Sequence, residues 1–121
     1  MSNVSRVVIK RSGLPDRVSN LCNVRRADSF LTRLVGLLSR RSLGDEEGLI
    51  IVPCASVHTF WMRFSIDLVF LDRQHRVLGI SENVKPNRVR VAPNGTFAVL
   101  EIAQGNVMRT GIHLDDILIF D

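Results

Sequence analysis

The alternation of hydrophobic and polar residues along the chain predicts mainly short β-strands. Runs of β-branched or alternating apolar residues recur, and clusters of Gly, Pro, Asn and Asp separate them. The predicted strands cover residues 4–10, 18–26, 49–52, 66–71, 77–82, 88–91, 97–102 and 117–120. Residues 72–75 have hairpin-loop character, so the strands on either side should pair in antiparallel fashion.

Two segments follow a helical period instead. The apolar residues between 28 and 38 fall on one helical face, which predicts a principal helix there. A short second helix is expected over residues 104–110, ended by Gly111. Together these elements predict a mainly β (α+β) fold: a compact antiparallel β barrel or sandwich of about seven or eight short strands.

The length of 121 residues favours one domain, in which residues 1–26 form an N-terminal arm or strands joined to a core of residues 27–121. Hydrophobic residues make up 45% and charged residues 23%, which is typical of a globular chain. Neither a signal peptide nor an apolar run of roughly 20 residues is apparent. We therefore expect a cytoplasmic protein that does not enter a membrane.

Charge is unevenly distributed. Residues 1–41 hold nine Lys or Arg and two Asp, whereas residues 42–121 hold seven Lys or Arg and ten Asp or Glu. Such an asymmetry suggests nucleic-acid binding through the Arg-rich first third as one hypothesis. The basic residues are scattered and no aromatic residues lie between them, so nucleic acid is an unlikely partner.

The stretch from His58 to Asp72 carries the most informative polar residues. Asp67 interrupts a strand that is otherwise apolar on both faces, and a buried carboxylate needs a partner. Arg63 is the nearest candidate, in a structural ion pair, whereas the functional alternative makes Asp67 a ligand-binding group or general base. The aromatic residues Phe60 and Trp61 are expected in the core.

Cys54 and His58 lie four residues apart, which separates them by about 13 Å in an extended chain. A bend after Pro53 could bring them together, but two ligands without a third are a weak metal signal, so no metal and no cofactor are predicted. Cys22 and Cys54 are expected to be free, buried thiols.

Several motifs occur together in a fixed order along the chain. They are Gly36-Leu37-Leu38, residues 47–50, residues 58–64, Ile66-Asp67, residues 82–86, Leu100-Glu101, Gly105, Gly111-Ile112 and Asp116. In this combination the chain resembles the family called domain of unknown function 192, over residues 27–120. The resemblance implies a small, mainly β fold and no established activity. The chain departs from the family at Asp115, where a glycine is common, which questions the backbone conformation of that turn.

The favoured hypothesis is a non-catalytic domain that binds a small ligand or a protein partner. The predicted ligand-binding residues are Cys54, His58, Arg63 and Asp67, which would line one polar cleft. The alternative is a hydrolase-like or metal-dependent enzyme that uses His58 and Asp67, with Cys54 as an optional nucleophile or ligand.

Overall fold

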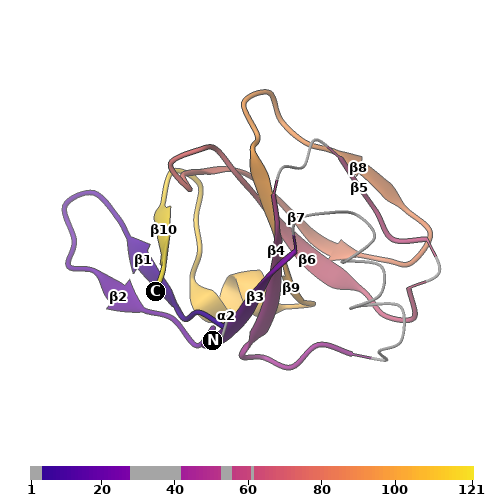
Figure 1. Cartoon of the computed structure of the whole chain (residues 1–121), viewed down its shortest axis with the longest axis horizontal. Coiled ribbons are helices and arrows are strands. Elements are labelled where there is room, and N and C mark those ends of the chain that lie inside the picture. The colour runs from indigo at the N-terminus through magenta and orange to yellow at the C-terminus, as the bar shows by residue number, and fades with distance from the viewer. Residues whose placement is uncertain (1–3, 28–41, 53–55, 61) are drawn as a thin grey trace.

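The computed structural model describes residues 4–27, 42–52, 56–60 and 62–121. Within them the chain forms ten strands and one short helix, α2 (Asn106–Thr110). The strands build three sheets rather than a closed barrel, and the mainly β, sandwich-like α+β fold is as predicted (Figure 1). The predicted principal helix over residues 28–38 lies outside the described residues.

The largest sheet has five strands in the order β3-β4-β9-β6-β7. Their bounds are β3 Asn23–Ala27, β4 Glu47–Ile51, β9 Ala98–Ala103, β6 Ile66–Leu71 and β7 Val77–Val84. All neighbours are antiparallel except β3 and β4, which run parallel. A parallel pair needs a crossover connection, and residues 28–46 supply its length.

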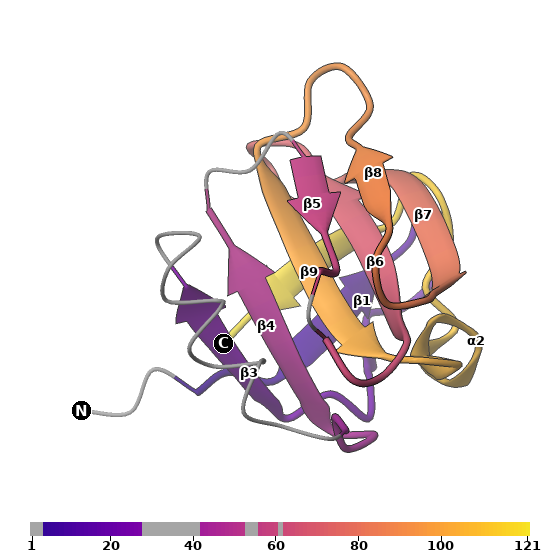
Figure 2. The same ribbon diagram turned by 90° about the vertical axis from the view of Figure 1, so that its right-hand side faces the viewer.

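Two smaller sheets flank the large one. The first has the order β10-β1-β2, with bounds β10 Ile117–Phe120, β1 Val7–Lys10 and β2 Arg17–Val18. The second pairs β5 Ser56–His58 with β8 Val89–Val91. Figure 1 shows the five-stranded sheet between them, and Figure 2 shows β5 and β8 in front of it, with β1 behind.

This arrangement gives the five-stranded sheet a hydrophobic core on each face. The first core lies towards β1 and β10 and includes Val69 and Leu71 of β6 together with Val107 of α2. The second lies towards β5 and includes Leu68 and Phe70. Strands β6 and β9 are buried at every position, which explains why β6 is apolar on both faces.

The chain ends are joined by strand pairing and by ion pairs. β1 pairs with β10 in antiparallel register, with Val7 opposite Phe120. Arg11 donates two hydrogen bonds of 2.8 Å to the carboxylate of Asp116, whose side chain is 1% exposed. Arg6 bonds Asp121 at 2.7 Å. These pairs engage two of the nine basic residues of the first third, Arg11 with a buried carboxylate and Arg6 with an exposed one.

Several local predictions are confirmed. The 72–75 turn is held by the Asp72 side chain, which accepts hydrogen bonds from the amides of Gln74 and Arg76, both at 2.9 Å. Helix α2 ends at Gly111, which has a φ of 71°. Asp115 keeps a left-handed φ of 70° although it is not a glycine, a conformation that aspartate tolerates better than most residues.

Other expectations need correction. The short strand at residues 56–58 was not among the predicted strands, and a turn follows it at Phe60. Phe60 is 39% exposed rather than buried, and Cys22 is an exposed free thiol. The predicted strand 18–26 is divided between β2 and β3. No helix among the described residues is both long and apolar enough to span a bilayer.

Candidate functional site

Asp67 is fully buried, and its carboxylate is satisfied by the main chain. Oδ1 accepts a hydrogen bond from the amide of Asn83 at 2.8 Å. Oδ2 accepts from the amides of Gly105 at 3.1 Å and Val107 at 3.0 Å, at the start of α2. The carboxylate thus fixes the start of the helix to two strands of the large sheet.

The geometry around Asp67 accounts for two of the motifs in the sequence, residues 82–86 and Gly105. The pairing of β6 with β7 is irregular between Ile66 and Leu68, and the extra β7 residue turns the Asn83 amide towards Asp67. Asn83 and Gly105 both have left-handed backbones, with φ of 52° and 89°. The conspicuous aspartate therefore supports the fold through amides that lie far away in the sequence.

The structure does not bring the predicted site residues together around Asp67. Asp67 faces the first core, on the side of α2, whereas β5, which carries His58, covers the second. Arg63 is exposed and forms no ion pair with Asp67. The His58 ring stacks on Phe60 at a centroid distance of 4.8 Å.

Cys54 lies outside the described residues, so its proximity to His58 is untested. A ligand-binding role for Cys54, His58, Arg63 and Asp67 stays a prediction.

Glu101 is a second fully buried carboxylate, which the predicted site did not include. It lies on β9 between Leu49 of β4 and Leu68 of β6. Strand alternation places it on the same face as Val99, which belongs to the second core. Its isolated position in an apolar strand and its place in the Leu100-Glu101 motif were the signals in the sequence, but a strand glutamate more often faces solvent.

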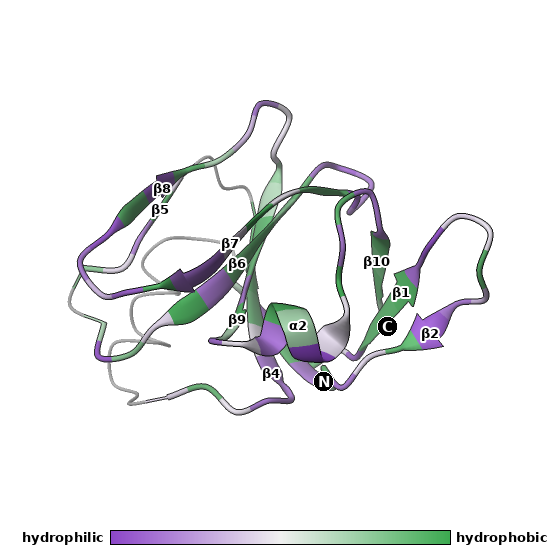
Figure 3. Ribbon diagram, turned by 180° about the vertical axis from the view of Figure 1, so that it is seen from behind, coloured by the Kyte–Doolittle hydropathy of each residue, from purple (hydrophilic) through white to green (hydrophobic). Residues whose placement is uncertain are grey.

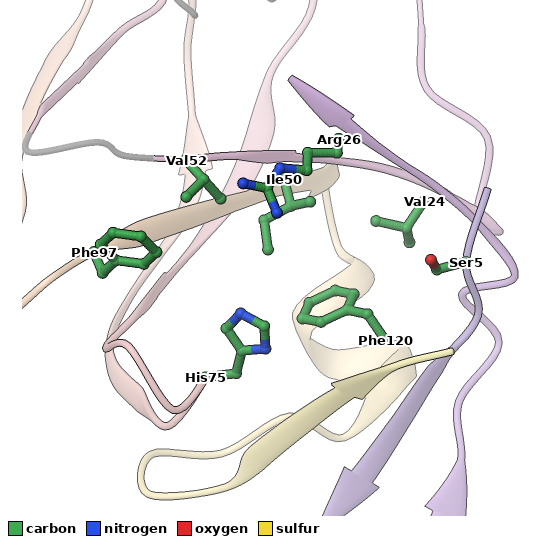
Figure 4. A pocket seen from close by; sticks show the side chains of 8 residues that line it. All are labelled: Ser5, Val24, Arg26, Ile50, Val52, His75, Phe97 and Phe120. Atoms are coloured by element: carbon green, nitrogen blue, oxygen red, sulfur yellow. The ribbon is translucent and has the colours of Figure 1, made fainter. Parts of the chain in front are cut away.

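A pocket of about 170 Å³ opens between the large sheet and the β10-β1-β2 sheet (Figure 4). Val24 and Arg26 of β3 line it, because alternate residues of a strand point to the same side. Its remaining walls are Ser5, Ile50, Val52, His75, Phe97 and Phe120. The lining is thus apolar apart from one hydroxyl, one guanidinium and one imidazole.

His75 is held in this pocket by the tight turn between β6 and β7. Its backbone has a left-handed φ of 63°, and its amide donates to the Asp72 carbonyl at 3.0 Å. Its own carbonyl accepts from the Leu118 amide of β10, also at 3.0 Å. The ring contacts Phe120 edge to face, with centroids 5.0 Å apart. The imidazole therefore sits on rigid backbone with a fixed aromatic neighbour.

Two nitrogen-bearing groups face the pocket from opposite walls. Figure 4 shows the Arg26 guanidinium on one side of the cavity and the His75 ring on the other. Burial lowers the pKa of His75 below its ordinary value of 6.5, and the positive charge of Arg26 lowers it further. Asp72 and a hydrogen bond with the Leu118 backbone oppose this shift without cancelling it. His75 is thus mainly neutral at neutral pH.

The arrangement suits recognition of an anionic group. A guanidinium, an imidazole and a hydroxyl can all donate hydrogen bonds to a carboxylate, while the apolar walls bury the rest of the molecule. Among the described residues, no three His, Cys, Asp or Glu side chains lie together as a metal site requires.

Sequence reasoning missed this pocket. Arg26 and His75 belong to no motif, and each resembles an ordinary surface residue.

Comparison with known proteins gives three kinds of similarity. The model of a protein family named DUF192 and described as "Uncharacterized ACR, COG1430" matches residues 14–120. The chain is 34% identical over 88 residues to the UPF0127 protein PH1112 of Pyrococcus horikoshii, a match that covers 68% of this chain and 73% of that protein.

Two solved structures share the fold. One is a protein of unknown function from Novosphingobium aromaticivorans, with a TM-score of 0.77, 28% identity, and coverage of 94% of this chain and 83% of that one. The other is a proposed transcription regulator from Sinorhizobium meliloti, with a TM-score of 0.81, 20% identity, and coverage of 99% and 97%. At 20% identity the second likeness shows the fold alone.

Proposed function

Because this chain belongs to the family called domain of unknown function 192, in which no activity is established, we propose its function from its own geometry. The pocket that contains Arg26 and His75 binds a small molecule with an apolar body and one anionic group. The observation that supports this proposal is that two nitrogen-bearing side chains face each other across a cavity whose other walls, apart from Ser5, are apolar.

The size of the pocket limits the ligand. Its volume is about 170 Å³, and a dry protein cavity of about 150 Å³ accommodates benzene. The ligand class is therefore a compact carboxylate of that size, such as an aromatic or short branched acid. Phe97 and Phe120 supply flat apolar walls for its body.

Charge determines how the ligand is oriented. Burial is the main cause that lowers the pKa of His75, and an anion between Arg26 and His75 would oppose both burial and the added repulsion from Arg26. Binding and protonation of His75 are then linked, so the bound anion raises the pKa of the imidazole. The hydroxyl of Ser5, beside Val24, completes the polar set at the edge of the pocket.

A titration with benzoate, compared with the neutral and similarly shaped benzamide, tests the proposal. NMR of the full chain should show benzoate shifting the His75 ring signals and raising its pKa, while benzamide leaves that pKa unchanged. Arg26→Gln should weaken benzoate binding about tenfold and leave benzamide binding unchanged. Equal binding of the two probes, or shifts confined to other surfaces, contradicts the assignment.

We also propose a cytoplasmic location. The exposed free thiol of Cys22 fits a reducing compartment better than an oxidising one. Cell fractionation of the full-length protein is the test, and recovery from an oxidising compartment contradicts the proposal.

A further inference from the structure

The β5-β8 pair leaves one strand edge open on the side of the molecule opposite the pocket. Among the described residues β8 pairs only with β5, through Val57 opposite Arg90 and His58 opposite Val89. The Arg88 carbonyl accepts a bond from the Thr59 amide at 2.9 Å. Backbone direction alternates along a strand, so the amides and carbonyls of Val89 and Val91 point away from β5. We call this outer edge, with residues 88–91, the β8 edge.

The β8 edge also exposes apolar side chains. Val89 is 51% exposed and Val91 is 80% exposed. By register they lie on the face of the strand pair that carries His58, beside Phe60. Figure 3 shows the alternation of hydrophilic and hydrophobic residues along β8. Proteins usually protect an exposed apolar strand edge, so this one suits a partner that pairs with it.

The charges around the β8 edge all have one sign. Residues 83–100 contain Lys85, Arg88 and Arg90 and no acidic residue. The guanidinium of Arg88 donates only to main-chain carbonyls of Pro86 and Asn87, at 3.4 and 3.3 Å. That of Arg90 donates to the Val89 carbonyl at 2.9 Å. No carboxylate within the described residues neutralises these charges.

We propose that the β8 edge binds an extended acidic segment of a partner protein, which adds as a third strand. The amides of Val89 and Val91 and the carbonyl of Val91 supply the pairing, while the Val89 carbonyl keeps its bond from Arg90. Acidic side chains of the partner meet Arg88 and Arg90. A polypeptide fits better than a nucleic acid because the exposed side chains on β8 are valines, which offer no flat face for a base. It fits better than a bilayer because hydrocarbon cannot satisfy the outward amides of Val89 and Val91 or the Val91 carbonyl.

The test compares synthetic peptides on the full-length protein. The first alternates glutamate and valine over about eight residues, a usual strand length. The second has the same sequence with N-methyl groups on every other amide, and it is made in two versions that differ in which set of amides is methylated. In one of the two versions the amides that face β8 can no longer donate hydrogen bonds. A third has lysine in place of glutamate. Binding is followed through the amide signals of Val89 and Val91 at low and high salt.

We expect the acidic peptide to shift both amide signals and to weaken at high salt. N-methylation and the Arg88→Glu substitution should each weaken binding about tenfold, and Arg88→Glu should gain affinity for the lysine peptide. Lys10→Glu, on β1, is the matched control and should change nothing. Val91→Pro removes one outward amide without changing charge and should weaken the acidic peptide.

Three results would overturn the proposal. The first is equal binding of the N-methylated and unmodified acidic peptides. The second is tighter binding of a single-stranded oligonucleotide to the same amides. The third is binding of anionic phospholipid vesicles that displaces the peptide. The first result would show that binding does not use strand pairing. The second and third would assign the β8 edge to nucleic acid and to a membrane surface, respectively.

Discussion

Two polar sites of this molecule differ in what their groups face. Asp67 is sealed, with both carboxylate oxygens bonded to backbone amides. Arg26 and His75 instead face a cavity of about 170 Å³. A buried polar group whose bonds all go to the main chain stabilises the fold and has little left for a ligand. The comparison suggests that a polar residue which stands out in the sequence need not belong to the site that binds.

The largest expected effect is at the sealed site. Asp67→Ala leaves three amides without acceptors, one of them buried, and should lower the free energy of unfolding by roughly 3 kcal/mol. Asp67→Asn keeps one acceptor oxygen and should lose less. Urea unfolding followed by circular dichroism measures both. If the free energies of unfolding of both variants lie within about 0.5 kcal/mol of the wild-type value, the Asp67 site does not stabilise the fold and the distinction between sealed and open sites is lost.

Asp116 offers a second sealed carboxylate that sharpens the comparison. Burial opposes its ionisation, but hydrogen bonds from Arg11 and the His113 amide prevail, so its pKa lies below the ordinary 3.8. Asp116→Asn should lower the free energy of unfolding by roughly 2 kcal/mol at neutral pH.

A group with a lowered folded pKa stabilises the protein above its unfolded pKa and loses that effect as the pH falls through the folded value. The gap between the wild type and Asp116→Asn should therefore begin to narrow near pH 3.8 and close at lower pH. Unfolding curves over an acidic pH series measure this difference in the free energy of unfolding. A difference that grows as the pH falls contradicts a lowered pKa for Asp116.

Arg26→Gln tests whether the pocket that contains Arg26 and His75 contributes to binding without contributing to the free energy of unfolding. Arg26 is exposed on an edge strand, so its replacement should change the free energy of unfolding by less than about 0.5 kcal/mol while weakening benzoate binding. Asp67→Asn should do the opposite, with benzoate affinity kept within about twofold. If either Arg26→Gln or Asp67→Asn changes stability and benzoate affinity to the same extent, the two sites are not independent.

The smallest expected effect is a pH dependence of binding. The pKa of His75 is lowered below 6.5, so the imidazole gains its proton only on the acidic side of neutrality. Benzoate affinity should rise as the pH falls through that pKa, by less than about tenfold. Calorimetry at several pH values measures this rise, and His75→Gln should abolish it. A wild-type benzoate affinity that does not change with pH would show that His75 does not contact the ligand.

Much of the fold could be predicted because it depends on local pattern. The strand at 66–71 and its hairpin to β7 follow from a short apolar run and a turn that Asp72 closes. The parallel pairing of β3 with β4 could not be predicted, because no local signal specifies it. The described residues form ten strands rather than the expected seven or eight. The predicted strand 18–26 is divided in two, and β5, which is only three residues long, has too short a pattern to predict.

The candidate site was less predictable for the same reason. The need of Asp67 for a partner was clear, yet its partners are amides 16 to 40 residues away in the sequence. Arg63, four residues away, was the nearest charge but is exposed. Arg26 lies on β3, at one edge of the large sheet, and His75 lies in the turn that leads to β7, at the other edge. Spacing along the chain does not reveal that both line one pocket.

The pairing of β1 with β10 also determines when the protein can fold. Val7 cannot pair with Phe120 until all the residues between them have been synthesised, on the order of ten seconds after Val7 itself. Until then β1 presents an unpaired apolar edge, the kind of surface that chaperones shield. Nascent chains arrested before Ile117 should accordingly be far more sensitive to protease than the released protein. Early resistance would show that the large sheet folds without its terminal strands.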